Sequence, residues 1–584
     1  MRKIFTPLAL LFSAVLAFPT VVSAQDLSGE PAFSFKSARG SREKSTERYV
    51  QVYLKSSEAG AKFYVVVDGQ ATEYDMVKAA TLYNKKITVD KPEVDVKIYG
   101  KTISFINFNT TDAYDVNVGE DGKNTIAELR SEGNPITSID FVNDMKALTY
   151  LYIGNNNKLT DVNIKSDVLE RVKLNKQNKI KNFTMEGEKI YEFSLTNNNG
   201  IESVDFSKCP ALTTVSLASD SAIKTVKFAE NPQKLKSVTI SYSQITEFAA
   251  KNMPALNDAS VIANKSLISC VFENCPLLTR LNLANNGLET FTLSDMPKLT
   301  YLSLDGNPFQ SLSLDLQALT TLYCDKTPLK SVDFSKLPKI KALYARNGVL
   351  ESIQLSDEAL ENTLSGLYVT DNNFGLVDLP ARGTKMKPSS SLTEPYNYYA
   401  PQKNPVLPTE VKVGDEIDLS KYLYAKLYKS DDVVNSVYKW VTKFDEELQE
   451  GVDYTVKDGV FKFNKAQEDS VACFITNTEF PWFKKYTDTK GKVYDYRLMT
   501  NYVAVNVATG VDAVEKSELK ATVKSLAANE ICVAGANGAT VVVSDIAGRV
   551  LVNEAVSDDK TFAVPASGLY IVAVGNDRFK ILVK

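Results

Sequence analysis

The stretch LTRLNLANNGL, residues 278–288, has leucines at its first, fourth, sixth and last positions and an asparagine at its ninth. The same spacing recurs in LTYLSLDGNPF, residues 299–309. Working outward from these two units, the pattern begins twelve times, in steps of 20 to 24 residues. The starts are Ile126, Leu148, Leu169, Ile190, Leu212, Leu235, Leu256, Leu278, Leu299, Leu319, Ile340 and Leu364. Twelve phased units predict a stack of similar coils.

This spacing is the leucine-rich repeat signature. A unit of about 22 residues cannot bury its apolar side chains alone, so neighbouring units must share one continuous core. Each unit is predicted to contribute a short strand, and its asparagine to satisfy backbone groups in the turns between coils. Alternating apolar pairs such as Val204/Phe206 and Val332/Phe334 have a period of two. The convex side is therefore predicted to be extended rather than helical.

The segments on either side of the repeats also show strand patterns. Residues 94–98 alternate strictly between apolar and polar side chains, and residues 49–54 do so in part. Short strand-like runs return after a segment containing five prolines. The predicted fold class is mainly β, a leucine-rich repeat solenoid flanked by small β domains. The predicted divisions are an N-terminal β domain or cap at 25–100, the solenoid at 101–385, a Pro-rich linker at 386–408, an immunoglobulin-like β-sandwich at 409–510 and a small C-terminal β domain at 511–584.

The first residues have the pattern of a secretory signal peptide. Two basic residues at positions 2 and 3 precede an apolar run over 4–22, and small residues close it. Cleavage is predicted between Ala24 and Gln25. The alternative is a membrane anchor, which two prolines within the run and the small-residue site disfavour. No other stretch is apolar and long enough to suggest a transmembrane segment in the mature chain.

The composition argues against catalysis. The chain has no histidine, which removes Ser-His-Asp and Cys-His nucleophile systems and His-containing zinc sites. Catalysis by a pair of carboxylates, by Lys or by Tyr remains open, but no group of residues in the sequence indicates it. We therefore predict no enzyme, no catalytic residues, no metal site and no cofactor, and expect the acidic run at 445–447 to be a solvated surface. A net charge of −4 with no basic tract predicts no nucleic-acid partner.

The six cysteines do not suggest a disulfide framework. Cys209 and Cys275 share one repeat phase three coils apart, beyond disulfide reach, while Cys270 and Cys324 occupy apolar repeat positions. Buried thiols are the expected state. A Cys270–Cys275 pair stays open because the two are close in sequence.

The position between the second and third leucines of each unit should face the concave side. At the C-terminal end this column contains three consecutive tyrosines, which strands about 4.8 Å apart would align. Tyrosine combines apolar area with a hydroxyl, so the patch is a candidate binding surface. The alternative is that cross-strand aromatic pairs only stabilise the sheet. The candidate binding residues are Tyr301, Tyr323, Tyr344, Tyr368, Asp305, Asp325 and Arg346.

The repeat array, over about residues 100–385, resembles internalin-like leucine-rich repeat proteins of Bacteroidota. The cadence ITSIDF at 136–141 followed by LTYL at 148–151 carries the likeness. The resemblance implies a secreted or cell-surface protein involved in adhesion, in host or biofilm interactions.

The C-terminus resembles the type A sorting domain of type IX secretion cargo. The matching stretches are VVVSDIAGRVL at 541–551, SGLYIV at 567–572 and KILVK at 580–584, which include Asp545, Gly548, Gly568, Tyr570 and Lys580. Asp545 and Gly548 suit a hairpin turn, and Gly568 suits the entry to a final strand. The resemblance implies recognition by the type IX secretion machinery and delivery to the outer-membrane surface or beyond. The alternative is a plain β-hairpin domain.

The sequence thus predicts a secreted or cell-surface protein whose concave face binds a macromolecular partner, a protein or glycan ligand at a cell surface. The alternative is a glycan-binding protein acting through the 409–510 sandwich, where Trp440 or Trp482 would stack on sugar. A carboxylate-based hydrolase is the third hypothesis.

Overall fold

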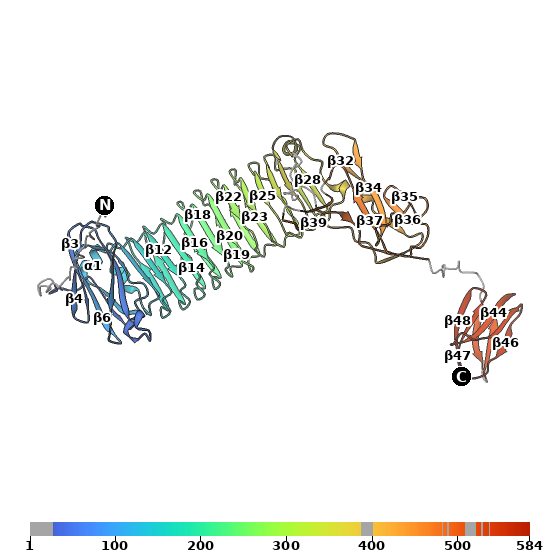
Figure 1. Cartoon of the computed structure of the whole chain (residues 1–584), viewed down its shortest axis with the longest axis horizontal. Helices are drawn as coiled ribbons and strands as arrows, with labels where there is room; N and C mark the ends of the chain where they lie inside the picture. Colours follow the sequence, from blue (N-terminus) through green and yellow to red (C-terminus); the bar gives the residue numbers. More distant parts are fainter. Residues whose placement is uncertain are drawn as a thin grey trace, which may run out of the picture.

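The computed structural model describes residues 27–386, 401–507 and 521–584, apart from positions 482, 488, 489, 527, 528 and 537. The predicted cleavage site at Ala24 and Gln25 and most of the Pro-rich linker lie outside the described residues. Along the chain, a β cap is followed by a long solenoid, a region of small sheets and a separate C-terminal β domain (Figure 1).

One 15-stranded sheet lines the concave side, and twelve of its strands belong to the repeats. Every repeat strand begins two residues after a predicted repeat start, which confirms the phase of all twelve units. The strands are β9 (Glu128–Glu132), β10 (Tyr150–Gly154), β12 (Arg171–Asn175), β14 (Glu192–Thr196), β16 (Thr214–Ala218), β18 (Ser237–Ser241), β20 (Asp258–Ile262), β22 (Arg280–Asn282), β24 (Tyr301–Ser303), β25 (Thr321–Tyr323), β27 (Ala342–Tyr344) and β29 (Gly366–Tyr368).

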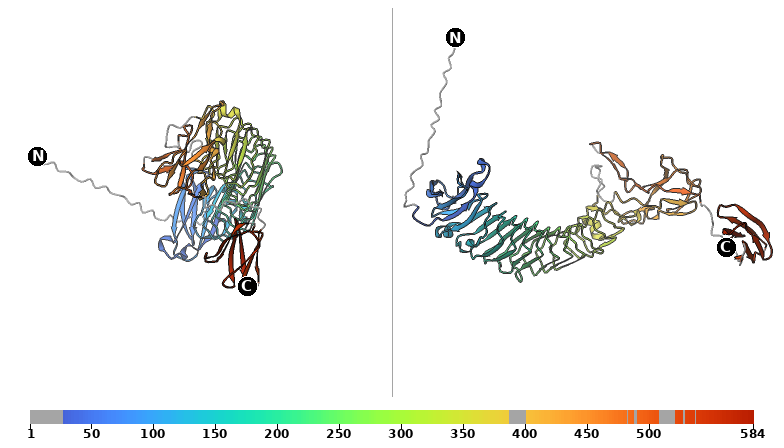
Figure 2. Two further views of the ribbon diagram at one scale, coloured as in Figure 1. Left: turned by 90° about the vertical axis from the view of Figure 1, so that its right-hand side faces the viewer. Right: turned by 90° about the horizontal axis from the view of Figure 1, so that it is seen from below.

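The parallel pairing of these strands puts equivalent repeat positions side by side. Leu281 pairs with Leu302, which pairs in turn with Leu322, and all three are fully buried. One continuous core therefore runs the length of the stack. Figure 2 shows the solenoid as an arch with the cap at one end and the 401–507 region at the other.

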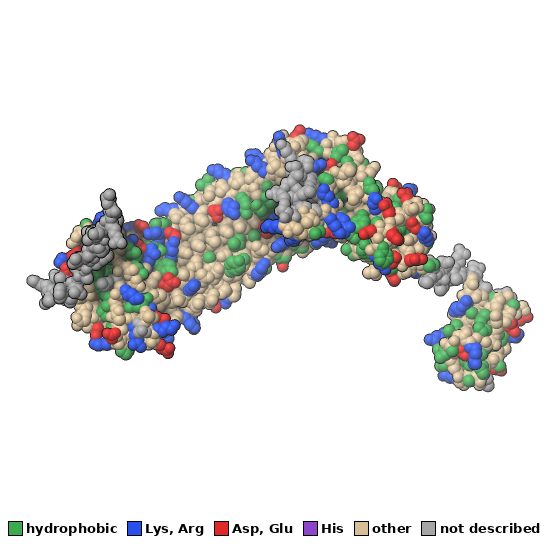
Figure 3. All heavy atoms as spheres, in the orientation of Figure 1, with side chains coloured by type: hydrophobic (Ala, Val, Ile, Leu, Met, Phe, Trp, Pro, Cys, Tyr) green, Lys and Arg blue, Asp and Glu red, His purple; other side chains and the backbone are tan. Residues whose placement is uncertain are grey.

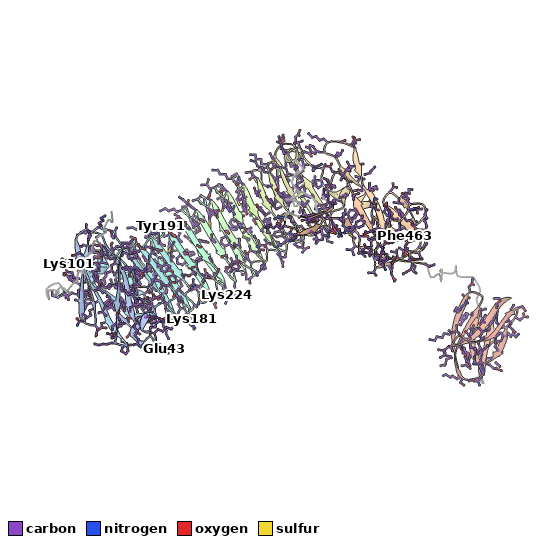
Figure 4. The ribbon with its side chains drawn as sticks, in the orientation of Figure 1. Glu43, Lys101, Lys181, Tyr191, Lys224 and Phe463 are labelled. Atoms are coloured by element: carbon purple, nitrogen blue, oxygen red, sulfur yellow. The ribbon has the colours of Figure 1, made fainter. Side chains whose placement is uncertain are left out.

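The convex side consists of short parallel strands, as the period-two pairs predicted. They form four small sheets rather than one continuous sheet. The strands are β11 (Asp161–Lys165), β13 (Asn182–Glu186), β15 (Ser203–Phe206), β17 (Thr225–Phe228), β19 (Glu247–Lys251), β21 (Ser269–Glu273), β23 (Thr290–Ser294), β26 (Ser331–Phe334) and β28 (Ser352–Leu355). Figure 4 labels Tyr191 at one long edge, just before a concave strand, and Lys181 and Lys224 at the other, just before convex strands.

Buried asparagines join successive coils at the turns, as predicted. Asn286 donates from Nδ2 to the carbonyl oxygens of Val261 and Leu283 at 2.6 and 2.8 Å. Its Oδ1 accepts the backbone N–H of Asn264 at 2.8 Å. Backbone groups that the narrow turns leave unpaired are satisfied in this way, which removes the cost of burying them.

The cap is built from two sheets packed face to face. The antiparallel sheet β4-β3-β6-β1-β8 covers strands β5, β2 and β7, which continue the concave sheet of the solenoid. The strands are β1 (Phe33–Ser37), β2 (Tyr49–Ser56), β3 (Ala61–Val67), β4 (Gln70–Met76), β5 (Tyr83–Thr88), β6 (Val94–Tyr99), β7 (Ile103–Asn107) and β8 (Ala113–Val118). Because β7 pairs in parallel with β9, cap and repeats share a sheet across the predicted division at residue 100.

The region after the solenoid contains small sheets around Trp440. Its strands are β30 (Glu410–Lys412), β31 (Glu416–Asp418), β32 (Tyr424–Lys426), β33 (Val433–Asn435), β34 (Val437–Thr442), β35 (Tyr454–Lys457), β36 (Val460–Phe463), β37 (Val471–Thr476), β38 (Lys485–Thr487), β39 (Val493–Asp495), β40 (Leu498–Met499) and β41 (Ala504–Asn506). Its apolar side chains belong to the same core cluster as the solenoid. Arg382 and Glu479 form an ion pair of 2.5 Å between the two parts.

The C-terminal domain has its own core. A sheet β42-β43-β46 packs on a sheet β45-β44-β47-β48, with a cluster of buried valines and Ile531 between them. The strands are β42 (Thr522–Leu526), β43 (Glu530–Ala534), β44 (Ala539–Asp545), β45 (Val550–Val556), β46 (Lys560–Ala563), β47 (Gly568–Val574) and β48 (Asp577–Val583).

Helices are short throughout the described ranges. They are α1 (Glu120–Thr125), the π-helical turn η4 (Ala359–Thr363) and the 3₁₀ turns η1 (Arg39–Ser41), η2 (Ser45–Glu47), η3 (Asp140–Asp144), η5 (Leu376–Asp378) and η6 (Ser420–Tyr422). Among the residues that the structure describes, no helix has the length and apolar character to cross a membrane.

All six cysteines are free thiols, including Cys270 and Cys275. Five are buried, and Cys532 is half-buried. Burial raises the pKa of the Cys270 thiol to about 12 and that of the Cys209 thiol to about 11. These thiols therefore act as small apolar core residues.

Candidate functional site

The structure brings the four predicted tyrosines together in one row on the concave sheet, here called the tyrosine stack (Tyr301, Tyr323, Tyr344 and Tyr368). Tyr323 and Tyr344 are register partners, as are Tyr344 and Tyr368. Their ring centroids lie 4.3 and 4.4 Å apart, and each pair of ring planes is within 3° of parallel. Tyr301 joins the row at 5.5 Å from Tyr323 with a tilt of 44°.

Arg280 extends the tyrosine stack by one strand, and the sequence analysis did not select it. Its guanidinium carbon lies 3.8 Å from the centroid of the Tyr301 ring. Arg280 and Tyr301 are register partners on β22 and β24. The repeat phase could have predicted this contact, because Arg280 and Tyr301 each follow the first leucine of their unit by two positions.

Asp305, Asp325 and Arg346 form a connected network beside the stack. The Asp305 Oδ1 accepts the backbone N–H of Asp325 at 2.7 Å. Arg346 donates its backbone N–H to the Asp325 Oδ1 at 2.6 Å, and its Nε and Nη2 to Oδ2 at 2.9 and 2.6 Å. The two carboxylates are thus largely used within the protein, and they fix the turns that follow the strands.

Burial changes the proton affinities at this end of the sheet. Loss of solvent, with smaller contributions from neighbouring tyrosines and Asp305, raises the pKa of Tyr323 to about 12. Burial likewise raises the pKa of the Asp305 carboxyl. The hydrogen bond to Asp325 raises the pKa of the Arg346 guanidinium. Tyr323 is therefore a neutral phenol at physiological pH, able to donate and accept hydrogen bonds but not to serve as a base.

A second row lies at the N-terminal end of the same sheet, and the sequence analysis missed it. We name it the cation–aromatic ladder, and it consists of Lys55, Phe105, Arg130, Tyr150 and Arg171. The Lys55 Nζ lies 4.9 Å from the Phe105 ring centroid. The Arg130 guanidinium carbon is 5.7 and 5.3 Å from the centroids of the Phe105 and Tyr150 rings, and that of Arg171 is 4.4 Å from Tyr150. Lys55 and Phe105 belong to the cap, so the repeat phase could not reveal them.

Trp440, proposed as a sugar-stacking residue, lies in the core and cannot take that role. Trp440 is part of β34, and its side chain is fully buried against the aromatic residues of β36. The ring meets Phe461 and Phe463 edge-on at centroid distances of 5.6 and 5.0 Å. Trp440 is the register partner of Cys473, which is also buried. Trp482 lies outside the described residues.

The acidic run at 445–447 is exposed, as expected. Glu447 pairs with Lys439 at 3.0 Å. Asp and Glu side chains are frequent on the face of the 401–507 region visible in Figure 3. Within the described ranges, no group of three His, Cys, Asp or Glu side chains is arranged to hold a metal ion.

The residues of the C-terminal motif lie at the turn of the β44–β45 hairpin and on the last two strands, β47 and β48. Asp545 ends β44, and its Oδ1 accepts the backbone N–H groups of Ala547 and Arg549 at 3.1 and 2.9 Å. Gly548 has a φ of +79°, which an L side chain would strain. This confirms the predicted turn.

Gly568, Tyr570 and Lys580 complete this motif. Gly568 begins β47, which is the penultimate strand and not the final one, since β48 follows it. Tyr570 is buried and donates its hydroxyl to the Ala566 carbonyl at 2.8 Å. Lys580 on β48 and Gly548 in the turn are the exposed residues of the motif, so they are the ones open to a partner.

Comparison with known proteins identifies a C-terminal match and several similar folds. The model of a domain of unknown function (DUF6383) matches residues 508–583. No curated protein matches the chain.

Three solved structures illustrate the similarity of the solenoid. The InlJ functional domain from Listeria monocytogenes, described as including a cysteine ladder, is 14% identical over 70% of this chain and 93% of its own, with a TM-score of 0.35. YopM from Yersinia enterocolitica is 18% identical over 53% and 72%, with a TM-score of 0.32. An internalin (inlF) from Listeria monocytogenes is 15% identical over 46% and 82%, with a TM-score of 0.27. At these scores, the fold assignment depends on the chain's own repeat phase and strand pairing.

Proposed function

We propose that this protein binds a protein partner through the concave face of its solenoid, with the tyrosine stack as an anchoring surface. The observation that carries the proposal is the parallel, face-to-face stacking of Tyr323, Tyr344 and Tyr368, with ring centroids 4.3 and 4.4 Å apart. Stacking fixes the rings before a partner arrives, so little side-chain freedom is lost on binding. Tyrosines held in this way provide apolar area and hydroxyls at low entropic cost, as in protein-recognition surfaces.

The geometry of the stack favours a protein ligand over a glycan. Sugars pack against open aromatic faces, but the faces of Tyr344 are covered by its two neighbours, and Arg280 covers one face of Tyr301. Each ring of the stack is partly exposed, and because the inner ring faces are stacked, the row presents a ribbon of ring edges. Such a ribbon suits a polypeptide, whose backbone offers donors and acceptors along its length. Trp440 is in the core, and no observation on the described residues of the 409–510 region favours glycan capture.

We further propose that the protein is secreted or displayed on the cell surface. The predicted signal sequence and the likeness of 511–584 to a type A sorting domain of Bacteroidota support this localisation. The separate core of the C-terminal domain supports a module that can act independently of the binding region. In this proposal the exposed Lys580 and the hairpin turn at Asp545 and Gly548 are the features offered to the type IX secretion machinery.

Substituting two adjacent rings tests the binding surface. Full-length protein and a Tyr323→Ala/Tyr344→Ala variant are used as bait against cell-surface proteins, and retained proteins are identified by mass spectrometry. Tyr242→Ala is the matched control, because Tyr242 is 61% exposed in a turn away from the stack. Circular dichroism checks that all three baits are folded. We expect a partner retained by the wild type and the control but lost by the double variant; retention by all three contradicts the assignment.

Deleting residues 511–584 tests export. In a cell that carries type IX secretion, the truncated protein should accumulate in the periplasm, while the full chain reaches the surface. Protease accessibility on intact cells and cell fractionation measure the two pools. Lys580→Ala in the full chain provides a finer variant, since an exposed side chain can be removed without disturbing the core. Surface display of the truncated protein at the full-length level would refute the sorting role.

A further inference from the structure

The N-terminal end of the concave sheet has more basic than acidic side chains facing outward. From β5 to β14, the outward positions of this face carry five cations and three carboxylates, namely Lys55, Lys86, Arg130, Arg171 and Lys173 against Glu128, Glu132 and Glu192. At the C-terminal end, the concave strands β24, β25, β27 and β29 carry no charged residue.

The carboxylates of this region are already occupied. Glu128 pairs with Arg130 at 2.5 Å, and Glu192 pairs with Lys173 at 2.7 Å. Glu132 accepts the hydroxyl of Tyr152 at 3.1 Å. Within the described residues, Lys55, Lys86 and Arg171 form no ion pair with a carboxylate, so they are the cations available to a ligand.

Aromatic rings hold all three of these cations in place, and the Lys86 Nζ lies 3.6 Å from the centroid of the Tyr49 ring. Phe105 and Tyr150 are 6% and 8% exposed, so they form a floor beneath the charged groups. The Arg171 guanidinium stacks on Tyr150 at 4.4 Å, and the Lys55 ammonium lies over Phe105 at 4.9 Å. A stacked guanidinium keeps its N–H edge free, and that edge matches a carboxylate in a bidentate arrangement. Their positions are therefore set before a ligand arrives.

We propose that this end of the sheet binds an acidic segment of a polypeptide, with Arg171 and Lys55 each receiving a carboxylate. The inference rests on the proposed function, because it assigns a second contact on the same concave face to a protein partner. β2 and β12 are separated by four strand steps, and at about 4.8 Å per step the two cations stand roughly 19 Å apart. An extended peptide rises about 3.3 Å per residue, so the two acidic positions should be separated by about six residues.

The experiment uses fluorescently labelled Gly/Ser peptides with two Glu-Glu pairs, spaced either about six residues apart or adjacent. Binding to the full-length protein is measured by fluorescence anisotropy at low and at high salt. The Lys55→Gln/Arg171→Gln variant removes the two cations. Lys181→Gln/Lys224→Gln is the matched control, because it makes the same change of net charge at the opposite edge of the solenoid (Figure 4).

We expect the widely spaced peptide to bind the wild type and the control, to lose affinity at least about tenfold in the Lys55/Arg171 variant, and to weaken with salt. Equal binding to both double variants would overturn the proposal, as would the absence of binding to the wild type. Dextran sulfate of matched charge is the competing polyanion. If it binds the same two residues more tightly than the peptide does, the site is a general anion site and the commitment to an acidic peptide is wrong.

The two proposals fail separately. Loss of peptide binding with a partner still dependent on Tyr323 and Tyr344 would remove the acidic-segment site and leave the proposed function in place. Peptide binding that requires Lys55 and Arg171, combined with a partner indifferent to the tyrosines, would do the reverse.

Discussion

The two ends of the concave sheet use aromatic side chains in different ways. At the C-terminal end, Tyr323, Tyr344 and Tyr368 stack on one another, and the surface they offer is neutral. At the N-terminal end, Phe105 and Tyr150 lie beneath cations, and the surface they support is charged. One sheet with one strand spacing thus produces two chemically different surfaces. The residue types at equivalent positions decide whether a ring stacks on another ring or lies beneath a cation.

The largest expected effect concerns what the two ends share, which is the leucine core. Leu151→Ala on β10 and Leu343→Ala on β27 each remove a fully buried side chain. Each substitution should lower the free energy of unfolding by about 2–5 kcal/mol, measured by chemical denaturation. Lys181→Ala, an exposed control, should change it by less than about 0.5 kcal/mol. Two resolved transitions, each shifted by only one of the substitutions, would show that the two ends unfold as separate units.

The second prediction concerns Asp220, which stands midway between the two ends where other coils have an asparagine. It is fully buried, its Oδ1 accepts the Asn198 backbone N–H at 2.8 Å, and its Oδ2 has no hydrogen-bond partner among the described residues. Burial raises the pKa of this carboxyl to about 7. The unfolded chain loses the proton near pH 4, so the folded state holds an extra proton between about pH 4 and pH 7.

Across that window the free energy of unfolding should fall with rising pH, by up to roughly 1.4 kcal/mol per unit from this group. The Asp220→Asn variant removes this dependence and should be more stable than the wild type at pH 8 and little different near pH 4. Thermal denaturation of both proteins at several pH values measures the difference. Parallel pH profiles for the two proteins would contradict the prediction.

The third prediction contrasts an acidic residue from each end. Asp325→Ala leaves the backbone N–H and guanidinium of Arg346 without their acceptor, and it should cost about 1–3 kcal/mol. Glu128→Ala removes only a solvent-screened ion pair with Arg130 and should cost less than about 1 kcal/mol. Chemical denaturation compares the two variants. Equal losses would mean that the Asp325 network is no more structural than the exposed pair.

The smallest effects are expected where side chains serve recognition rather than folding. Tyr344→Phe keeps the ring stack and loses one hydroxyl, and Arg171→Gln loses one stacked cation. Each should change the free energy of unfolding by less than about 1 kcal/mol, as differential scanning calorimetry can verify. A large destabilisation by either variant would identify the rows as structural supports, which is the alternative reading of aromatic pairs across strands.

Much of the solenoid was predictable because its information is local and periodic. Each repeat start from Ile126 to Leu364 precedes its strand by the same two residues, and the tyrosine column followed from the alternation of side chains across a strand. Arg280 could have been found by the same rule. Phe105 and Lys55 could not, because their place beside the repeats results from the pairing of β2 with β7 and of β7 with β9, and neither cap strand follows the repeat phase.

Trp440 shows a different limit. A single aromatic residue in a strand is not part of a repeat, so its sequence position does not predict whether it is buried. Whether its ring face is open depends on which side chains of the opposite sheet pack against it. In this fold Phe461 and Phe463 close over it.

By itself, the sequence determined the architecture, which is a mainly β stack of repeats with a concave face and a row of tyrosines. The reason is that equivalent positions of successive repeats become neighbours in the folded solenoid. Only the tertiary structure decided which of these side chains are available. Carboxylates such as Asp325 are used within the protein, and Trp440 is enclosed, whereas Arg171 and Lys55 lie over aromatic rings and have no carboxylate partner among the described residues. Availability depends on contacts between distant segments, and no local pattern records those contacts.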